Sequence, residues 1–254
     1  MRGVELAEPA SKLKELLSLK GEPVALALLN EELGGALRAR DLGVKVLRLC
    51  QMAMLSRTHR WMVEAGVEDL AYMCSYVLGL RDDLPSRLAE DYAEYWFRDV
   101  GDGLRKLEEM YRAPRRGQRF VATAPLSKAS FKPSALLIYL NPAQACLALC
   151  ALQWSHYRRL TFTFTGESAC SDSIARCLAT GEASLTVPCF GERRFGHVQD
   201  DELLLAISPG MLEGLVEGLR ALRRRGVVYP IPFAGPQLDL TKALPERYRR
   251  LYEA

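Results

Sequence analysis

Short apolar runs alternate with helical patterns along the second half of the chain, and this alternation constrains the fold most. Apolar runs of five to seven residues bounded by turn-forming residues are typical of buried strands. Such runs cover residues 120–126, 135–140, 183–187 and 203–207. The segments between and after them that carry helical patterns are residues 142–154, 172–179 and 209–225. The sequence therefore predicts an α+β or α/β fold, with a mixed β-sheet flanked by helices.

The first half of the chain is mostly helical by the same criteria. The predicted helices cover residues 11–19, 47–56, 69–80 and 85–112, and the apolar run PVALALL at residues 23–29 predicts one early strand. Gly101 and Gly103 are expected to interrupt the last helix. The alternating segment LTFTFT at residues 160–165 predicts a further strand.

The chain is long enough for a single compact unit, either undivided or built from two subdomains. We expect a mostly helical N-terminal subdomain at residues 1–113, a strand and helix core at residues 114–228, and a C-terminal arm at residues 229–254. The proline- and arginine-containing stretch after residue 113 marks the boundary between the first two.

Composition and charge narrow the possible partners and compartment. The 254 residues carry a net charge of +3, and the basic residues form no long stripe of the kind that binds nucleic acid. No apolar stretch approaches the ~20 residues of a membrane span, and the N-terminus lacks the pattern of a signal peptide. We therefore expect a cytoplasmic protein with no nucleic-acid or membrane partner, in which the seven cysteines stay reduced. The sequence does not indicate an oligomeric state.

Four cysteines lie near the ends of predicted elements, beside glycine, serine or proline. They are Cys50, Cys74, Cys170 and Cys189. Buried cysteines that act as small hydrophobic side chains are more often found in the middle of an apolar face. Four thiolates brought together from element ends suit an iron–sulfur cluster or a zinc ion. The alternative is four free thiols in an ordinary core. The other three cysteines, Cys146, Cys150 and Cys177, lie on apolar helices and are expected to pack in the core.

Ordered motifs across most of the chain resemble a family of uncharacterised prokaryotic proteins, the domain-of-unknown-function family numbered 169. These motifs are PVALALL, RLCQMAM, YMCSYVLGL, APLSKASFKPSALLIYLNPAQA, FTGESACSDSIA and VPCFGERRFG. The resemblance implies an α+β fold in a soluble protein with no assigned biochemical role. The recurring cysteines of the family correspond to Cys50, Cys74, Cys170 and Cys189. This chain departs from the family pattern at two places. It has Ser75 and Tyr76 where the family usually has glycines soon after its second cysteine, and Phe190 where the family usually has a small polar residue after its fourth.

The leading interpretation is a redox-related protein with a [4Fe-4S]-type cluster held by Cys50, Cys74, Cys170 and Cys189. Zinc is the second choice of cofactor. Short Cys-x-x-Cys motifs, which usually supply structural zinc ligands, are absent from the chain. The long gaps between the cysteines instead suit a cluster enclosed by separate loops of a folded core. Such a protein acts in electron transfer with a redox partner protein, or on a small anionic substrate.

A second interpretation is an enzyme with a nucleophile in the segment Gly-Glu-Ser-Ala-Cys. This segment resembles a nucleophile elbow, with Ser168 or Cys170 at the bend. A helix start can lower the pKa of Cys170, and His197 is the candidate base. Asp172 is expected to cap the following helix. The sequence leaves open whether the protein is an enzyme, and a third interpretation is a non-catalytic module stabilised by zinc or binding a small ligand.

A small anionic substrate has candidate binding residues beside the third and fourth cysteines. Arg193 and Arg194 follow Cys189, and two arginines in a glycine-flanked loop suit a carboxylate or phosphate. The same arginines could instead pair with the acidic residues at 200–202. Gly166 begins the turn before a predicted helix, where backbone N–H groups can bind an anion.

Overall fold

A six-stranded antiparallel sheet forms the centre of the molecule. The computed structural model describes residues 3–232, 245–246 and 250, so most of the predicted C-terminal arm lies outside the described residues. The strands are β1 (Val24–Leu29), β2 (Val63–Gly66), β3 (Phe120–Pro125), β4 (Ala135–Leu140), β5 (Ser184–Thr186) and β6 (Leu203–Ile207). They follow the order β2-β3-β1-β4-β6-β5, and the five pairings between named strands are antiparallel. This confirms the predicted α+β class.

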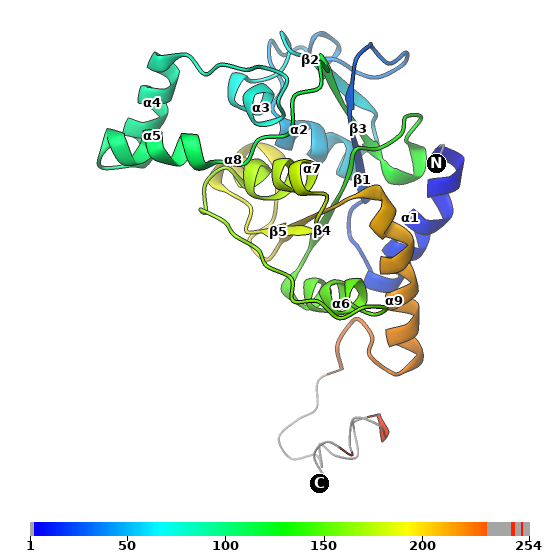
Figure 1. The fold of residues 1–254 in the computed structure, drawn as a ribbon. Coiled ribbons are helices and arrows are strands. Elements are labelled where there is room, and N and C mark those ends of the chain that lie inside the picture. Colours follow the sequence, from blue (N-terminus) through cyan, green and yellow to red (C-terminus); the bar gives the residue numbers. More distant parts are fainter. Residues whose placement is uncertain (1–2, 233–244, 247–249, 251–254) are drawn as a thin grey trace.

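The central strands are apolar along their whole length because helices cover both faces of the sheet (Figure 1). In β4 every residue is buried. Leu136, Ile138 and Leu140 join one hydrophobic core, whereas Leu137 and Tyr139 join the other. This alternation is the period of two that a strand imposes on its side chains. Continuous apolar runs therefore predicted these strands correctly.

Three long helices cover the first face. They are α1 (Gly3–Leu17), α6 (Pro142–Leu152) and α9 (Leu212–Arg224). Their apolar residues form one core with the buried residues of β1, β3, β4 and β6 that face these helices. Asn141 and Gln144 cap the start of α6 reciprocally, and the Gln144 side chain also donates to the carbonyl of Leu17 at the end of α1. The segment NPAQA at residues 141–145 thus has a structural role, because it caps α6 and joins it to α1.

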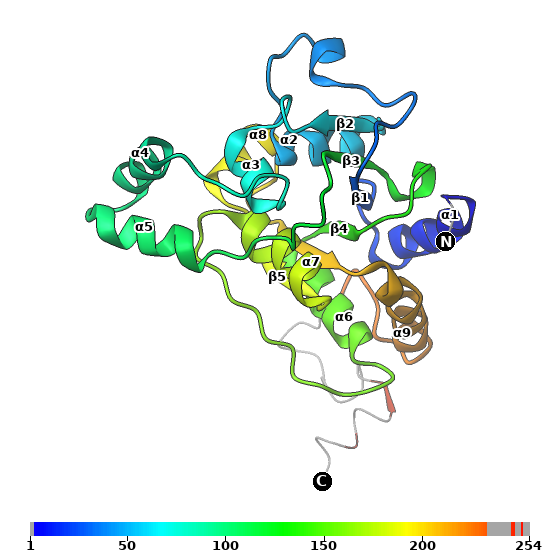
Figure 2. The ribbon, with the colours of Figure 1, turned by 45° about the horizontal axis from the view of Figure 1, so that its top comes forward.

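Short helices cover the second face, where the four candidate cysteines lie. They are α2 (Leu49–Met54), α3 (Tyr72–Val77), α7 (Arg176–Thr180) and α8 (Phe190–Gly196). A π-helical turn, η2 (Leu55–His59), extends α2, and a second one, η4 (Ser171–Ala175), precedes α7. The described residues also form three single 3-10 turns, namely η1 (Ala39–Leu42), η3 (Leu126–Lys128) and η5 (Pro209–Met211). Figure 2 shows α2, α3 and α8 gathered together, away from α1 and α9.

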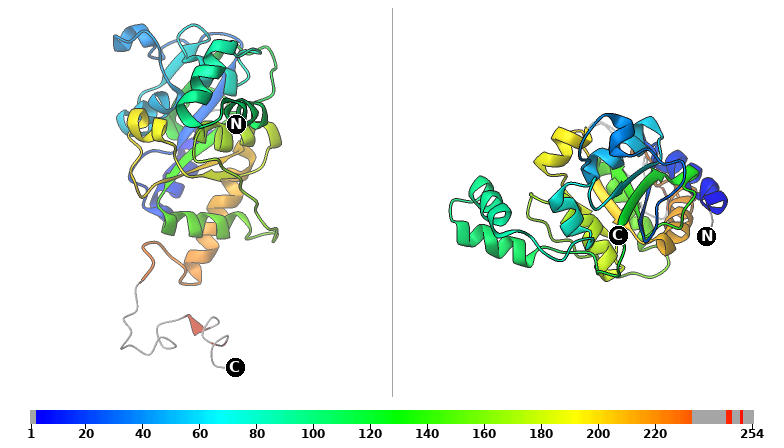
Figure 3. Two further views of the ribbon diagram at one scale, coloured as in Figure 1. Left: turned by 90° about the vertical axis from the view of Figure 1, so that its left-hand side faces the viewer. Right: turned by 90° about the horizontal axis from the view of Figure 1, so that it is seen from above.

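A helical hairpin projects from one side of the molecule, as Figure 1 and the right-hand view of Figure 3 show. It consists of α4 (Ser86–Trp96) and α5 (Val100–Glu109). The expectation that Gly101 and Gly103 interrupt the helix was wrong, because both lie inside α5 and the chain turns before it. A Cβ on Gly103 would lie 2.4 Å from that of Ala93, so the glycine allows the two helices to cross closely.

The alternating segment at residues 160–165 is not a strand, which corrects the sequence-based expectation. It runs along the surface without pairing to the sheet, and Phe164 is exposed. Alternation specifies a strand only where one face is buried against a core and a neighbouring strand is available. This segment is mostly exposed, so it has no buried face that would hold it against the sheet.

The two predicted subdomains contribute to a single sheet. Strand β1, from the first segment, lies between β3 and β4 of the second, and β2 pairs with β3. The sheet is therefore complete only when residues 1–113 and 114–228 fold together, and the boundary between two units at residue 113 stays a prediction.

Candidate functional site

Helices α2 and α3 start side by side because the segments before them pair with each other. A parallel bridge joins Leu47 to Leu70, with hydrogen bonds from Leu47 N to Asp69 O and from Ala71 N to Leu47 O. Cys50 lies in the first turn of α2 and Cys74 in α3. The N–H of Leu49 donates to the Cys74 sulfur at 3.5 Å. Two cysteines 24 residues apart in the sequence thus lie at adjacent helix starts.

Cys170 and Cys189 approach these helices from the other side. Cys170 lies in the first turn of the helix that contains η4, and Cys189 directly precedes α8. Burial raises the pKa of the Cys189 thiol and the nearby Glu192 carboxyl adds to the effect, whereas the backbone of Ala169 and Glu192 opposes it. The Cys50 thiol contacts the carbonyl oxygen of Gly191 at 3.8 Å, which links α2 to α8.

The four cysteines line one cavity of about 220 Å³, which we term the four-cysteine cavity. Its other lining residues are Arg48, Leu49, Met73, Val77, Tyr92, Glu167, Ser168, Gly191, Glu192 and Phe195. The cavity has room for several water-sized groups. The sequence-based grouping of Cys50, Cys74, Cys170 and Cys189 therefore corresponds to residues that line one cavity of the fold.

Burial raises the pKa of all four thiols, so they are protonated at neutral pH without a cation among them. For Cys74 and Cys170, burial is the main cause, and the neighbouring Cys189 and Glu192 add to it. The same holds for Cys50, where the backbone N–H of Gln51 opposes the effect. The pKa of Cys170 is thus raised, whereas a helix start alone suggested a lowered one. A bound cation would reverse the balance, because metal-ligating thiols are deprotonated.

Glu192 is a buried carboxyl group on the wall of the four-cysteine cavity. It is 3% exposed, and its Oε2 has no hydrogen-bond partner. Burial raises its pKa to about 7, although Arg193 and Arg57 oppose the shift. A carboxyl group whose pKa lies near neutral pH can take up or release a proton beside the four sulfurs.

A polar cluster at the α4–α5 hairpin contributes Tyr92, Glu167 and Ser168 to the lining of the four-cysteine cavity. Lys106 of α5 donates to Ser168 Oγ at 2.8 Å and also to the Tyr92 hydroxyl and the Glu167 carboxylate. Ser168 is buried and has a left-handed backbone with φ of +58°, which is uncommon outside glycine. Burial lowers the pKa of Lys106 to about 8, with Asp172 and Cys170 opposing. The hairpin thus brings a lysine and a tyrosine to a strained serine.

The other candidate residues lie outside the four-cysteine cavity. His197 lines a different pocket. Arg193 donates to the carbonyl of Gln199 at 2.7 Å and pairs with Asp200 at 3.6 Å. Arg194 lies 5.9 Å from the ring of Phe190. Gly166 has φ of +80° and open space around its Cα.

Asp172 does not cap the helix as expected, because the helix starts earlier and its carboxylate accepts from Thr165 N at 2.8 Å. Among the remaining cysteines, Cys177 is buried as predicted. Cys146 and Cys150 are exposed, which corrects the expectation of core packing. Although α6 is apolar nearly all round, only one side of it faces the core.

Two absences concern the described part of the chain alone. Among residues 3–232, 245–246 and 250, no group of three or more His, Cys, Asp or Glu could hold a metal ion. Within the same residues, every helix is too short or too polar to cross a membrane.

Comparison with known proteins gives the family. The family model DUF169, described as "Uncharacterised ArCR", matches residues 12–218. The chain belongs to this family. An uncharacterized protein of Methanocaldococcus jannaschii, MJ0308, is 25% identical to this DUF169 chain over 228 residues, which cover 87% of the chain and 96% of the relative. No solved structure matches the chain.

Sequence reasoning missed three residues of this DUF169 site. Tyr92 and Lys106 lie in a segment rich in charged residues, and nothing in their local sequence indicates a buried contact. Glu192, which directly precedes the candidate residues Arg193 and Arg194, was not predicted as a site residue. Its position one helical turn after Cys189 was the available signal, since residues three apart share a helix face.

Proposed function

We propose that this protein binds an iron–sulfur cluster of the [4Fe-4S] type through Cys50, Cys74, Cys170 and Cys189. The observation that carries the proposal is that these four cysteines, from four separate elements, line one cavity. Thiolates are the usual ligands of such clusters. When bound, the cluster would supply one-electron transfer.

The residues around the cavity suit this cofactor in two further respects. The backbone N–H of Leu49 donates to the Cys74 sulfur, and hydrogen bonds of this kind tune cluster potentials. The sulfurs also surround a cavity instead of meeting at one point. Around a single zinc ion, with Zn–S bonds of about 2.3 Å, four sulfurs would meet closely. In a cubane each thiolate binds a different iron, so its ligands stand further apart.

Protons and charge follow from the same residues. The four thiols are protonated at neutral pH, so cluster assembly would release protons. Arg48 lines the cavity and opposes the raised pKa of Cys74, which means that it stabilises negative charge there. Glu192 would remain protonated beside a negatively charged cluster. A soluble redox partner protein and a cytoplasmic location complete the proposal.

The test is iron, acid-labile sulfide and the visible spectrum of protein produced and purified without oxygen. We expect about four iron and four sulfide per chain. Replacing any one of Cys50, Cys74, Cys170 or Cys189 by alanine should remove most of both. The matched control is Cys146→Ala, since Cys146 is exposed on α6 and does not line the four-cysteine cavity. One zinc per chain without sulfide, or protein free of both iron and sulfide, would contradict the proposal.

A second candidate function rests on the contact between Ser168 and Lys106. In this alternative Ser168 Oγ attacks an acyl carbon, and its proton passes to Lys106 Nζ and then to the leaving group. Lys106 takes the role of base that the sequence suggested for His197. The ion pair with Glu167 opposes this role, because it holds the proton on the lysine. The raised pKa of Cys170 disfavours a cysteine nucleophile at the same turn.

A fluorophosphonate probe separates this alternative from the cluster. If Ser168 is a nucleophile, the probe labels it in folded, metal-free protein, and Lys106→Met slows labelling by about 100-fold. Ser173→Ala is the matched control, since Ser173 is another buried serine of the same helix. Absence of labelling at Ser168 would rule out the nucleophile.

A further inference from the structure

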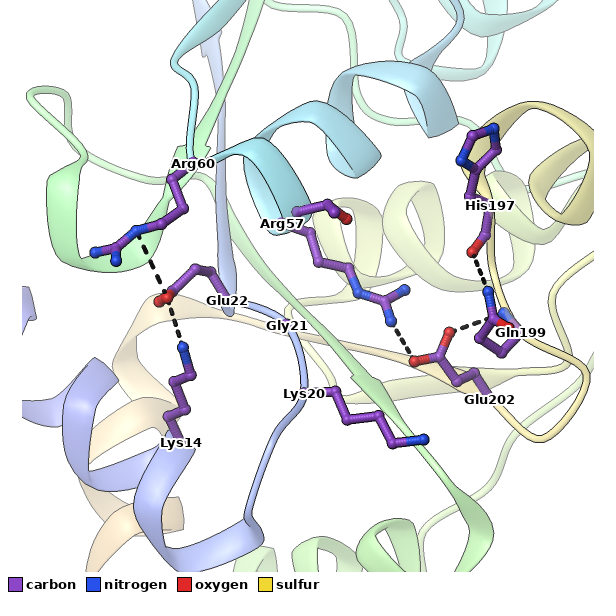
Figure 4. A pocket seen from close by; sticks show the side chains of 10 residues that line it. Lys14, Lys20, Gly21, Glu22, Arg57, Arg60, His197, Gln199 and Glu202 are labelled. Carbon is purple, nitrogen blue, oxygen red and sulfur yellow. Dashed lines mark hydrogen bonds and ion pairs between the residues drawn. The ribbon is translucent and has the colours of Figure 1, made fainter.

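A second and larger pocket lies at the end of the sheet where β1 and β6 begin (Figure 4). It has a volume of about 520 Å³. We term it the polar pocket, because its lining contains no apolar side chain. The lining residues are Lys14, Lys20, Gly21, Glu22, Arg57, Thr58, Arg60, His197, Gln199 and Glu202. Small-molecule sites usually have this size but a mostly apolar lining, so an occupant of this pocket is hydrophilic.

Arg57, the cation at the centre of the polar pocket, is held in place by contacts with three residues. Arg57 pairs with Glu202, and its guanidinium lies 4.5 Å from the ring centroid of the buried Tyr139. Its stem passes over Gly21, where a Cβ would come within 2.6 Å of the arginine side chain. A guanidinium fixed in this way is preorganised to bind an oxyanion.

The remaining cations outnumber the carboxylates that could neutralise them. Lys14 and Arg60 share one partner, Glu22, at 2.6 and 3.7 Å. Lys20 forms no ion pair with any residue that the structure describes, and in Figure 4 its side chain extends below Arg57. Four cations therefore face two carboxylates, Glu22 and Glu202, across the pocket. The excess charge is positive, and it comes from segments far apart in the sequence.

We propose that the polar pocket binds a small hydrophilic oxyanion with at least two negative charges, either a phosphate ester or a polycarboxylate. Lys20 and Arg57 are the residues that contact it, whereas the Arg60 side chain points away from them in Figure 4 and adds positive charge at longer range. The proposal stands independently of the iron–sulfur cluster, since no lining residue of the polar pocket also lines the four-cysteine cavity. It also differs from the site that Arg193 and Arg194 suggested, as neither arginine lines this pocket.

The test is isothermal titration of the purified protein with two probes, pyrophosphate for the phosphate class and citrate for the carboxylate class. We expect saturable binding of at least one probe, and the stronger one identifies the class. Lys20→Gln should weaken binding by about fivefold, as for a partly exposed charge contact, and Arg60→Gln should weaken it less, because its charge acts at longer range. Raising NaCl to about 1 M should weaken it further, because the Debye length falls to about 3 Å.

The matched control is Lys12→Gln, which removes a lysine of the same region that lies outside the pocket. It should leave the affinity unchanged. Binding that Lys12→Gln weakens as much as Lys20→Gln does would reveal only general attraction to a basic surface and overturn the proposal. The proposal would also be overturned if the measured heat came from chelation of a metal by the probe, in which case none of the three substitutions would alter it. The absence of saturable binding to either probe would overturn it as well. Thermal melts of the three variants confirm that each is folded.

Discussion

Lys106 joins the α4–α5 hairpin to the rest of the molecule, and replacing it by methionine tests that attachment. Its ammonium group contacts Tyr92, Glu167 and Ser168, and the side chains of Lys106 and Glu167 are 10% and 19% exposed. Removing one partner of a buried ion pair costs about 3–5 kcal/mol, since the other charge is left without a partner. Because this pair is partly exposed, we expect a loss of about 3 kcal/mol for Lys106→Met.

The double variant Lys106→Met/Glu167→Gln separates the ion pair from lost packing. With both charges removed, most of the loss should be recovered, because neutral replacements of a buried pair are often tolerated. We expect a coupling energy of about 2 kcal/mol from urea unfolding of the wild type, both single variants and the double variant. Arg105→Met is the control, since Arg105 pairs with Asp102 on the exposed side of the same helix. It should cost less than about 1 kcal/mol.

The loss should also depend on pH in a defined direction. Burial raises the pKa of Glu167, and we expect the loss of the paired ammonium of Lys106 to raise it further, because a nearby positive charge favours the carboxylate. A raised pKa means that the folded state binds the proton more tightly, so the unpaired carboxylate destabilises the fold only above the ordinary value of about 4.5. The cost of Lys106→Met should therefore shrink toward pH 4. If the single and double variants are equally unstable at every pH, the ion pair is not what attaches the hairpin.

Two further predictions concern backbone packing and a buried acid. Gly196→Ala should destabilise the protein by about 1–3 kcal/mol in urea unfolding, because the new Cβ would lie 3.1 Å from Cys50, whereas Gly191→Ala on the same helix meets only the Cys189 sulfur at 3.7 Å and should be tolerated. Glu64→Gln should stabilise the protein in thermal melts above pH 4.5 and have little effect below it, since burial raises the pKa of this carboxyl. Equal effects of the two glycine substitutions, or a pH-independent effect at Glu64, would contradict the respective reasoning.

Two short helices on the second face of the sheet connect the four-cysteine cavity with the polar pocket. Helix α2 carries Cys50 at its start, and its π-helical extension η2 carries Arg57. At a rise of about 1.5 Å per residue, the two lie about 10 Å apart along the helix. Similarly, α8 begins after Cys189 and ends before His197. A proposed electron-transfer site and a proposed anion site are thus connected by two short helices.

Much of the local structure could be predicted from the sequence. Strands β4 and β6 have the predicted bounds, because each is a short apolar run buried on both faces. The capping residues Asn141 and Gln144 act as their types suggest. The segment at residues 160–165 has an equally clear pattern but is not a strand, because it lies mostly exposed on the surface and has no buried face.

The sequence by itself determined the α+β class, the positions of the central strands and the choice of four cysteines out of seven. These depend on apolar periodicity and on residues near element ends, which are local properties. Only the tertiary structure decided that these cysteines share one cavity, that Lys106 reaches Ser168 from a distant hairpin, and that cations from α1 and η2 face a common pocket. The physical reason is that strand order and helix crossings set such contacts. They arise from the burial of the whole core and leave no periodic signal in the segments that they join.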